Sequence, residues 1–93
     1  MKKKKESLEG INVFDLTRVL AGPTATQILG DLGANIIKVE RPVSGDDSRN
    51  LGPPYLDSNS TEPKESAYFL SVNRNKSSVT IDLTKKEGQE LAK

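Results

Sequence analysis

The order of apolar segments in residues 11–39 restricts the fold more than any other feature of the sequence. A short apolar run at residues 11–16 is typical of a strand buried on both faces of a parallel sheet. A second run predicts another strand at residues 36–39, and the segment between the two has a helical pattern. We therefore expect one β-α-β unit with two parallel strands and a right-handed crossover.

The predicted helix has a recognisable beginning, stripe and end. Gly22 can serve as its N-cap, and Pro23 has a φ angle already suited to the first helical position. Gly33 suits the left-handed residue that follows a helix ending near Leu32. The apolar stripe that we expect to pack on a core consists of Ala25, Ile28, Leu29 and Leu32.

The second half of the chain predicts one long connection and three short elements. Residues 41–64 are rich in Pro, Gly, Asp, Ser and Asn, and a connection of this length is typical of a functional loop. Residues 65–72 suit a short helix, and residues 78–83 suit a third strand. Thr84 is then expected to cap a final helix with few apolar residues, so we expect the domain to continue beyond this chain.

These elements together predict an α/β fold class. The chain has the pattern of a Rossmann-like β-α-β start of a doubly wound parallel sheet, in an incomplete domain. A hydrophobic fraction of 33% and an aromatic content of 4% leave few large side chains for a core. Part of the apolar surface is therefore expected to require a partner segment.

The charged residues and the missing residue types exclude several functions. A net charge of +1 gives no electrostatic reason to bind nucleic acid or a membrane surface, so the expected partner is a small molecule. The chain has no Cys and no His, which excludes thiolate nucleophiles and the usual zinc sites, and we expect no metal. Residues 1–7 are interpreted as a disordered basic tail without a secretory signal, so we expect a protein that is not secreted.

Ligands of doubly wound sheets bind beyond the carboxyl ends of the strands. The segments in that position are residues 17–23, residues 40–49, and Thr84 with Lys85, and we expect the three to converge. Gly22 and Pro23 match an anion-binding helix start only in part, because proline lacks an N–H donor. The sequence also lacks the glycine-rich dinucleotide and Walker patterns, which argues against ordinary dinucleotide or nucleoside triphosphate binding.

Arg41 is the best candidate for a phosphate contact, because its guanidinium follows the second predicted strand directly. The alternative is a surface residue paired with Glu40 or Asp46. No carboxylate has an evident activating neighbour, and the Gly-Asp-Asp sequence at residues 45–47 is typical of a solvated loop or an Asx turn. We therefore name no catalytic residue.

Several blocks of sequence carry a more specific signal than these residue types. They are LEGINVFDLTRVLAGP at residues 8–23, LGDLGANIIKVERP at residues 29–42, GDD with Arg49 at residues 45–49, and YFLSVNRNK at residues 68–76. In this order the blocks resemble the N-terminal portion of the family III CoA-transferases, the CaiB/BaiF group. Within the family, the likeness is greatest to the succinate/hydroxymethylglutarate type.

The resemblance implies an enzyme that transfers coenzyme A from an acyl-CoA, such as succinyl-CoA, to a free carboxylic acid. In the family an Asp attacks the thioester and forms covalent anhydride and enzyme-thioester intermediates. That Asp would lie outside this chain, so residues 8–93 would be the N-terminal part of the large domain and inactive alone. The resemblance further implies an interlocked homodimer, with CoA bound as a substrate and no permanent cofactor.

The family's CoA contacts can be carried over by position. They fall on the connection after the first strand, on the arginine after the second strand, and on the run at the end of the third: Leu20, Ala21, Arg41, Ile81, Asp82, Leu83 and Thr84. Formyl-CoA transferases have Gln where this chain has Leu20, which argues against formyl-CoA and oxalate as substrates. A contacting Lys is common at the position of Thr84, and Lys85 is a candidate substitute.

Two other interpretations stay open at this point. An α-methylacyl-CoA racemase fragment would use the same pocket to abstract a proton beside the thioester. A truncated, non-catalytic binding module is an alternative of a different class. The closest type of relative implies the mitochondrial matrix in a eukaryote and the cytoplasm otherwise, although residues 1–10 lack the pattern of a transit peptide.

Overall fold

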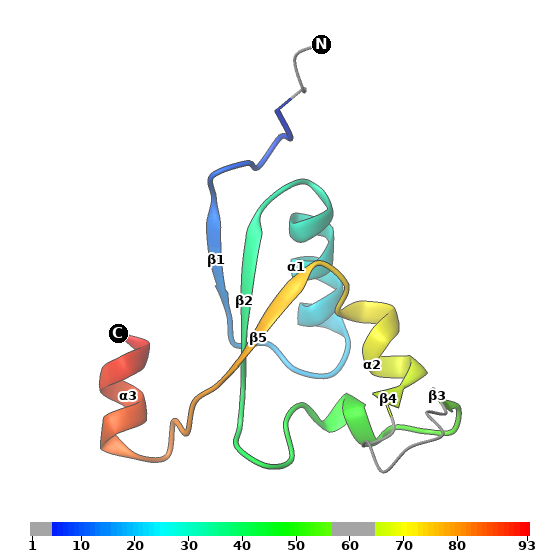
Figure 1. Cartoon of the computed structure of the whole chain (residues 1–93), viewed down its shortest axis with the longest axis vertical. Coiled ribbons are helices and arrows are strands. Elements are labelled where there is room, and N and C mark those ends of the chain that lie inside the picture. Colours follow the sequence, from blue (N-terminus) through cyan, green and yellow to red (C-terminus); the bar gives the residue numbers. More distant parts are fainter. Residues whose placement is uncertain (1–4, 57–64) are drawn as a thin grey trace.

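A parallel sheet of three strands forms the centre of the chain (Figure 1). The computed structural model describes residues 5–56 and 65–93. The strands β1 (Asn12–Asp15), β2 (Asn35–Glu40) and β5 (Lys76–Thr80) lie in the order β1-β2-β5, with β2 parallel to both neighbours. The predicted α/β class and the parallel pairing of the first two strands are confirmed.

The third strand begins and ends earlier than the sequence predicts. β5 covers residues 76–80, where the prediction was residues 78–83. Residues 81–84 therefore follow the strand, and the Ile81 N–H donates to the carbonyl of Glu40 as the chain leaves the sheet. The CoA-contact candidates of this region consequently lie on a connection and not at the strand end itself.

The helix α1 (Ala21–Asp31) connects β1 to β2 and confirms the β-α-β unit. Its N-cap is Leu20, which makes no side-chain cap, so the prediction that Gly22 is the N-cap was wrong. Pro23 lies in the first helical turn, where a missing N–H costs nothing because that group would have no partner within the helix. Gly33 has a φ of 107°, as expected for the left-handed residue after the helix.

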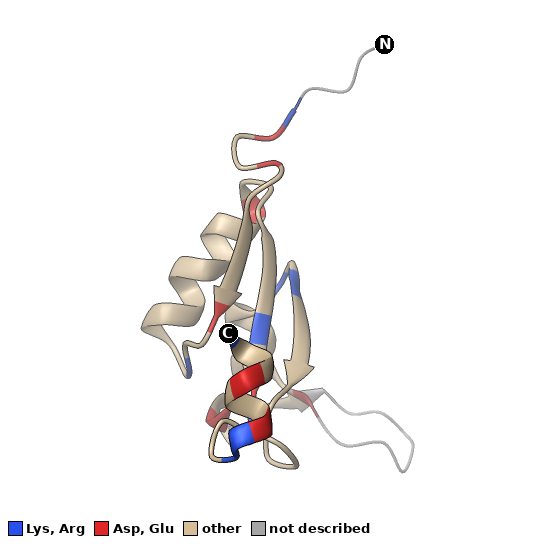
Figure 2. Ribbon diagram, turned by 90° about the vertical axis from the view of Figure 1, so that its left-hand side faces the viewer, with Lys and Arg blue, Asp and Glu red and all other residues tan. Residues whose placement is uncertain are grey.

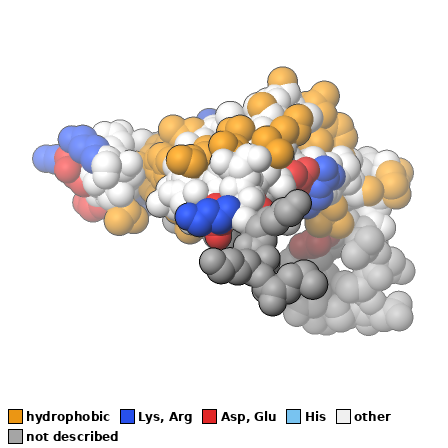
Figure 3. Space-filling model, turned by 90° about the horizontal axis from the view of Figure 1, so that it is seen from above, with side chains coloured by type: hydrophobic (Ala, Val, Ile, Leu, Met, Phe, Trp, Pro, Cys, Tyr) orange, Lys and Arg blue, Asp and Glu red, His pale blue; other side chains and the backbone are white. Residues whose placement is uncertain are grey.

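The face of α1 that touches the sheet is the opposite of the predicted one. Its buried residues are Pro23, Thr26 and Gln27, whereas the apolar stripe is exposed, with Ile28 53% and Leu32 45% accessible. The reason is the polar surface of the sheet beneath the helix, because Thr26 Oγ1 donates to Asp15 Oδ2 at 2.7 Å. Figure 3 shows hydrophobic side chains gathered along the side of the molecule where α1 lies.

The opposite face of the sheet is also open. β1 is an edge strand, and the side chains of Phe14 and Leu16 are 46% and 51% exposed. The prediction that this strand is buried on both faces was therefore wrong within this chain. The buried apolar side chains lie instead around β2 and α2, at Ala34, Ile36, Val39, Phe69 and Val72.

The long connection predicted at residues 41–64 contains regular structure. It includes the 3-10 helix η1 (Asp47–Asn50) and the strand β3 (Tyr55–Leu56), which pairs with β4 (Glu65–Ser66). Residues 57–64 of this prediction, and residues 1–4 of the predicted basic tail, lie outside the described residues.

The remaining two helices are short. α2 (Ala67–Val72) begins at Ser66, whose Oγ accepts a hydrogen bond from the Phe69 N–H. α3 (Lys86–Ala92) begins after Lys85 without a side-chain cap. The predicted cap at Thr84 was wrong, because its hydroxyl donates to Asp82. No helix in the described part of the chain is both long and apolar enough to cross a bilayer.

Candidate ligand-binding site

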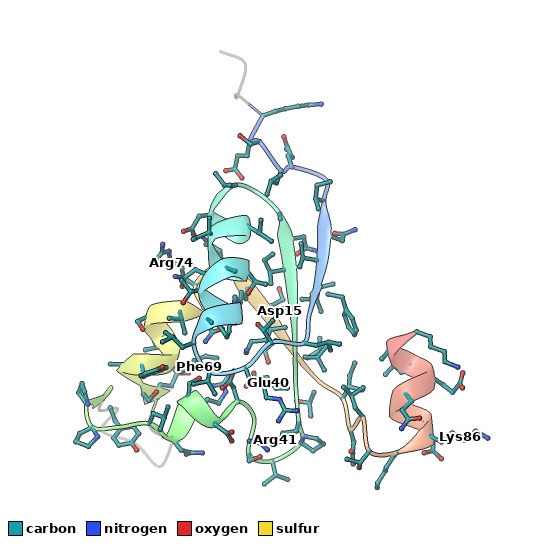
Figure 4. The ribbon with its side chains drawn as sticks, turned by 180° about the vertical axis from the view of Figure 1, so that it is seen from behind. Asp15, Glu40, Arg41, Phe69, Arg74 and Lys86 are labelled. Carbon is teal, nitrogen blue, oxygen red and sulfur yellow. The ribbon has the colours of Figure 1, made fainter. Side chains whose placement is uncertain are left out.

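A pocket of about 270 Å³ lies beyond the carboxyl ends of the strands. Three segments line it: Leu16 and Arg18 after β1, residues 39–41 and 45–46 from β2 and the following loop, and residues 81–84 after β5. These segments were predicted to converge, and the structure brings them together. Figure 4 shows Glu40 and Arg41 at this end of the sheet.

The predicted contact residues divide between the pocket and its surroundings. Arg41 and residues 81–84 line the pocket. Leu20 and Ala21 are exposed and belong to the start of α1, and neither they nor Lys85 are among the lining residues. A volume of about 270 Å³ is close to the lower limit of small-molecule sites, so the pocket can hold only part of a ligand as large as CoA.

Arg41 is held in place by the loop that follows it. Its Nε donates to the carbonyl of Gly45 at 3.0 Å, and its guanidinium forms an ion pair with Asp47. The alternative pairing with Glu40 or Asp46 was wrong, because those carboxylates have other partners. The Arg41 side chain is 44% exposed, so solvent screens its ion pair and a ligand can reach the guanidinium.

A buried ion pair lies directly behind the pocket. Lys38 Nζ is 2.8 Å from Asp46 Oδ2 and also donates to the carbonyl of Thr17 at 3.1 Å. Asp46 accepts further hydrogen bonds from the Val19 N–H at 3.2 Å and from the Ser48 N–H and hydroxyl at 2.9 Å each. Burial works to raise the pKa of Asp46, but the hydrogen bonds and charge of Lys38 and the bonds from Ser48 outweigh it and lower the pKa to about 2.

Glu40 is the last residue of β2, and its charge is neutralised by Arg49. Arg49 donates to its two oxygens at 2.7 and 2.8 Å, and the Asp46 N–H and the Ser78 hydroxyl also donate to it. The hydrogen bond from Arg49 is the main reason why the pKa of Glu40 falls to about 2. The Arg49 guanidinium also lies 3.7 Å from the centre of the Phe69 ring, which fixes it against α2.

A second buried ion pair lies between the sheet and α1. Lys76 Nζ is 3.3 Å from Asp15 Oδ2, and both side chains are almost inaccessible. Burial opposes the charge of Asp15, but hydrogen bonds from Thr17 and Thr26 and the Lys76 charge bring its pKa below the ordinary value. Burial lowers the pKa of Lys76 despite the nearby carboxylate. Figure 2 shows charged residues on the strands themselves.

Sequence reasoning missed Lys38 and Lys76. Both lie on the face of the sheet that α1 covers, in register with Asp15 and Ile36 respectively. The signal that could have found Lys38 is the alternation along β2, where it stands on the same face as Ile36 and Glu40. A lysine at an inward strand position requires a carboxylate partner, and in the structure Asp46 pairs with Lys38 and Asp15 with Lys76.

The pocket offers binding groups and no activated carboxylate among the described residues. Glu40 and Asp46 are ion-paired, and Asp82 accepts from the Thr84 N–H and hydroxyl. Within residues 5–56 and 65–93, no cluster of three or more potential ligands is placed to hold a metal ion.

A parallel α/β sheet with a pocket at the carboxyl ends of its strands places the chain among the α/β folds, which commonly bind ligands at this edge. Residues 8–93 match the model of "CoA-transferase family III". The chain belongs to that family, which confirms the resemblance given by the sequence blocks.

Individual relatives agree with this assignment. The chain is 55% identical to a succinyl-CoA:glutarate CoA-transferase of Mus musculus over 86 residues, covering 92% of this chain and 18% of that protein. It is 47% identical to a succinate–glutarate CoA-transferase of Agrobacterium fabrum over 93 residues, covering 100% of this chain and 23% of that protein. The chain thus spans about a fifth of the length of these curated relatives.

A solved structure shows the same fold. The crystal structure of a CaiB/BaiF family protein from Brucella suis matches with a TM-score of 0.84 and 48% identity, covering 95% of this chain and 22% of that one. This match confirms the fold class.

Proposed function

We propose that this chain forms the CoA-binding N-terminal segment of a transferase that moves coenzyme A from an acyl-CoA to a free carboxylic acid. The observation that carries the proposal is the convergence of Arg41 and residues 81–84 in one pocket at the carboxyl edge of the sheet. The names of the relatives make succinyl-CoA the candidate donor and glutarate a candidate acceptor.

The pocket has suitable groups for part of a CoA molecule. The Arg41 guanidinium can give a phosphate two parallel hydrogen bonds once the ligand competes with Asp47. Leu16 and Leu83 supply apolar surface beside it, on which the less polar parts of the ligand can pack. Leu20 and Ala21 lie on the connection between β1 and α1, outside the pocket lining, and we assign them contacts with a part of the ligand that extends beyond it.

The chemical step would require a residue from outside this chain. In the proposed reaction an Asp carboxylate attacks the thioester carbonyl, which forms a mixed anhydride and releases CoA as thiolate. The CoA thiolate then attacks the anhydride at the Asp carbonyl, forming an enzyme thioester and releasing the donor acid. The acceptor carboxylate attacks this thioester, which forms a second anhydride and releases the CoA thiolate. The thiolate then attacks the acceptor's acyl carbonyl, which forms the new acyl-CoA and restores the Asp carboxylate. The carboxylates that line the described pocket are occupied by their own partners, which supports a binding role for this segment.

A homodimer of the full-length protein is part of this proposal. The exposed apolar stripe of α1 and the exposed side chain of Phe14 support it, because apolar surface of this kind is normally covered by other protein.

The direct test is isothermal titration calorimetry of CoA into the purified chain, with circular dichroism on the same sample to establish that it is folded. Saturable binding by the folded chain supports the proposal, and absence of binding by the folded chain contradicts it. If the chain alone is unfolded, the same titration is made with the full-length protein. There, conversion of succinyl-CoA and glutarate to glutaryl-CoA separates a transferase from a racemase, which would need no acceptor acid.

A further inference from the structure

Arg18 differs from the other charged side chains that line the pocket. Glu40 and Asp46 are neutralised by Arg49 and Lys38, and Arg41 is paired with Asp47. Among the described residues, Arg18 has no ion-pair or hydrogen-bond partner for its guanidinium, although it lines the same pocket. Asp82 also lines the pocket, and its carboxylate accepts hydrogen bonds from the Thr84 N–H and hydroxyl. Within the described residues, the Arg18 guanidinium is therefore the charged group of the lining that is free to bind a ligand.

The backbone on both sides of Arg18 is fixed by the buried ion pair. Lys38 donates to the carbonyl of Thr17 on one side, and Asp46 accepts from the N–H of Val19 on the other. Val19 has a φ of 70°, in the left-handed region that a β-branched residue rarely adopts. Such a conformation persists only when surrounding contacts impose it, and the Asp46 hydrogen bond is one of them.

Arg18 is thus an exposed guanidinium on an immobilised connection at the edge of the pocket. A side chain whose backbone is already fixed loses less conformational freedom when it binds a ligand. A phosphate group in the pocket would find Arg41 already shared with Asp47, so one guanidinium would compensate its charge only partly. A second guanidinium, from the connection after the neighbouring strand β1, would add to the compensation.

We propose that Arg18 is a second phosphate-binding residue of the pocket and that it acts together with Arg41. The proposal rests on the proposed CoA function for the identity of the ligand. CoA offers two phosphate sources, its 3′-phosphate and its diphosphate, and both present the same oxygen chemistry to a guanidinium.

The experiment compares wild type, Arg18→Gln and Arg18→Lys by calorimetric titration with CoA and with 3′-dephospho-CoA. We expect Arg18→Gln to weaken CoA binding about tenfold, because a hydrogen-bonded charge contact at an exposed site is lost. Arg18→Lys should recover part of the affinity, since it keeps the charge without the planar fork. If Arg18→Gln loses affinity only for CoA, Arg18 contacts the 3′-phosphate. If it loses affinity for both ligands, Arg18 contacts the diphosphate.

The matched control is Arg74→Gln. Arg74 is also an exposed arginine, but it pairs with Asp31 at the other end of the sheet. It should leave CoA affinity unchanged, and circular dichroism should show that all variants are folded. Equal affinity of wild type and Arg18→Gln for both ligands would overturn the proposal.

A separate probe keeps the two proposals distinguishable. If the folded wild type does not bind CoA, the proposed function fails, and inorganic pyrophosphate followed by NMR shifts of the arginine side chains then tests Arg18 alone. Shifts of the Arg18 signal that saturate, while the Arg74 signal stays in place, would preserve the anion site. Absence of such shifts would show that Arg18 binds no phosphate group either.

Discussion

Lys38 Nζ lies 2.8 Å from Asp46 Oδ2, and each side chain is only 1% exposed. This pair joins the central strand β2 to the loop before η1, and its hydrogen bonds to Thr17 and Val19 extend it to the connection after β1. Two of the three segments that line the pocket are therefore held by one buried contact.

The first prediction concerns this ion pair. Lys38→Met should lower the free energy of unfolding by about 3–5 kcal/mol, because it leaves the buried Asp46 carboxylate without its counter-ion. Urea unfolding followed by circular dichroism measures the change. The double variant Lys38→Met/Asp46→Asn should recover part of the loss, since the amide keeps an acceptor for Ser48 without the charge.

Lys93→Met is the matched control for Lys38. Lys93 pairs with Glu90 at the surface with 75% of its side chain exposed, so its replacement should change stability by less than about 0.5 kcal/mol. Similar effects of the two substitutions would show that Lys38 and Asp46 are not buried as described.

The second prediction is a loss of stability in acid. The pKa values of Glu40 and Asp46 are lowered to about 2 in the folded chain from ordinary values of 4.5 and 3.8. Between these values the unfolded chain binds more protons, so the free energy of unfolding falls as the pH falls from about 4.5 towards 2. Each carboxylate should contribute on the order of 2–3 kcal/mol, because each unit by which a pKa is lowered corresponds to about 1.4 kcal/mol. Urea unfolding at several pH values measures this slope, and a slope unchanged in Asp46→Asn would contradict the assignment.

The third prediction tests which face of α1 packs on the sheet. Ile28→Gln should change the free energy of unfolding by less than about 0.5 kcal/mol, because this side chain is 53% exposed. Thr26→Val should cost about 1–3 kcal/mol, because it removes the hydroxyl that donates to the buried Asp15 carboxylate. Thermal or urea unfolding of the two variants would reverse this order if the apolar stripe faced the sheet.

The fourth prediction concerns Arg41. Arg41→Ala should weaken CoA binding by about 1.5–3 kcal/mol, the range for hydrogen bonds to charged groups. The fold should be retained, because the ion pair that is lost with Asp47 is exposed. An unchanged affinity for CoA in calorimetric titration would show that Arg41 does not contact the ligand.

The β-α-β unit could be predicted from sequence because its signals are local. Apolar runs mark β1 and β2, and Gly33 marks the end of α1 with its left-handed backbone. The meeting of the three pocket segments also followed from local signals, because parallel strands bring their carboxyl ends to one edge.

The orientation of α1 could not be predicted from its own residues. An apolar stripe normally indicates the core side of a helix, but here the sheet beneath α1 presents Asp15, Lys38 and Lys76. Thr26 is buried because its hydroxyl donates to Asp15, 11 residues away in the sequence. Gln27 is buried because its side-chain oxygen accepts from the N–H of Arg74, 47 residues away and just before β5. Local periodicity contains no information on such long-range pairing.

The central position of β2 also bears on the order of folding. β2 pairs with β1 across a connection that contains only α1, but with β5 across one that contains η1, β3, β4 and α2. Closing the shorter connection costs less chain entropy, so the pair β1–β2 should form before β5 is added. The amide protons of β2, enclosed between two neighbouring strands, should then be the last in the sheet to exchange with deuterated solvent.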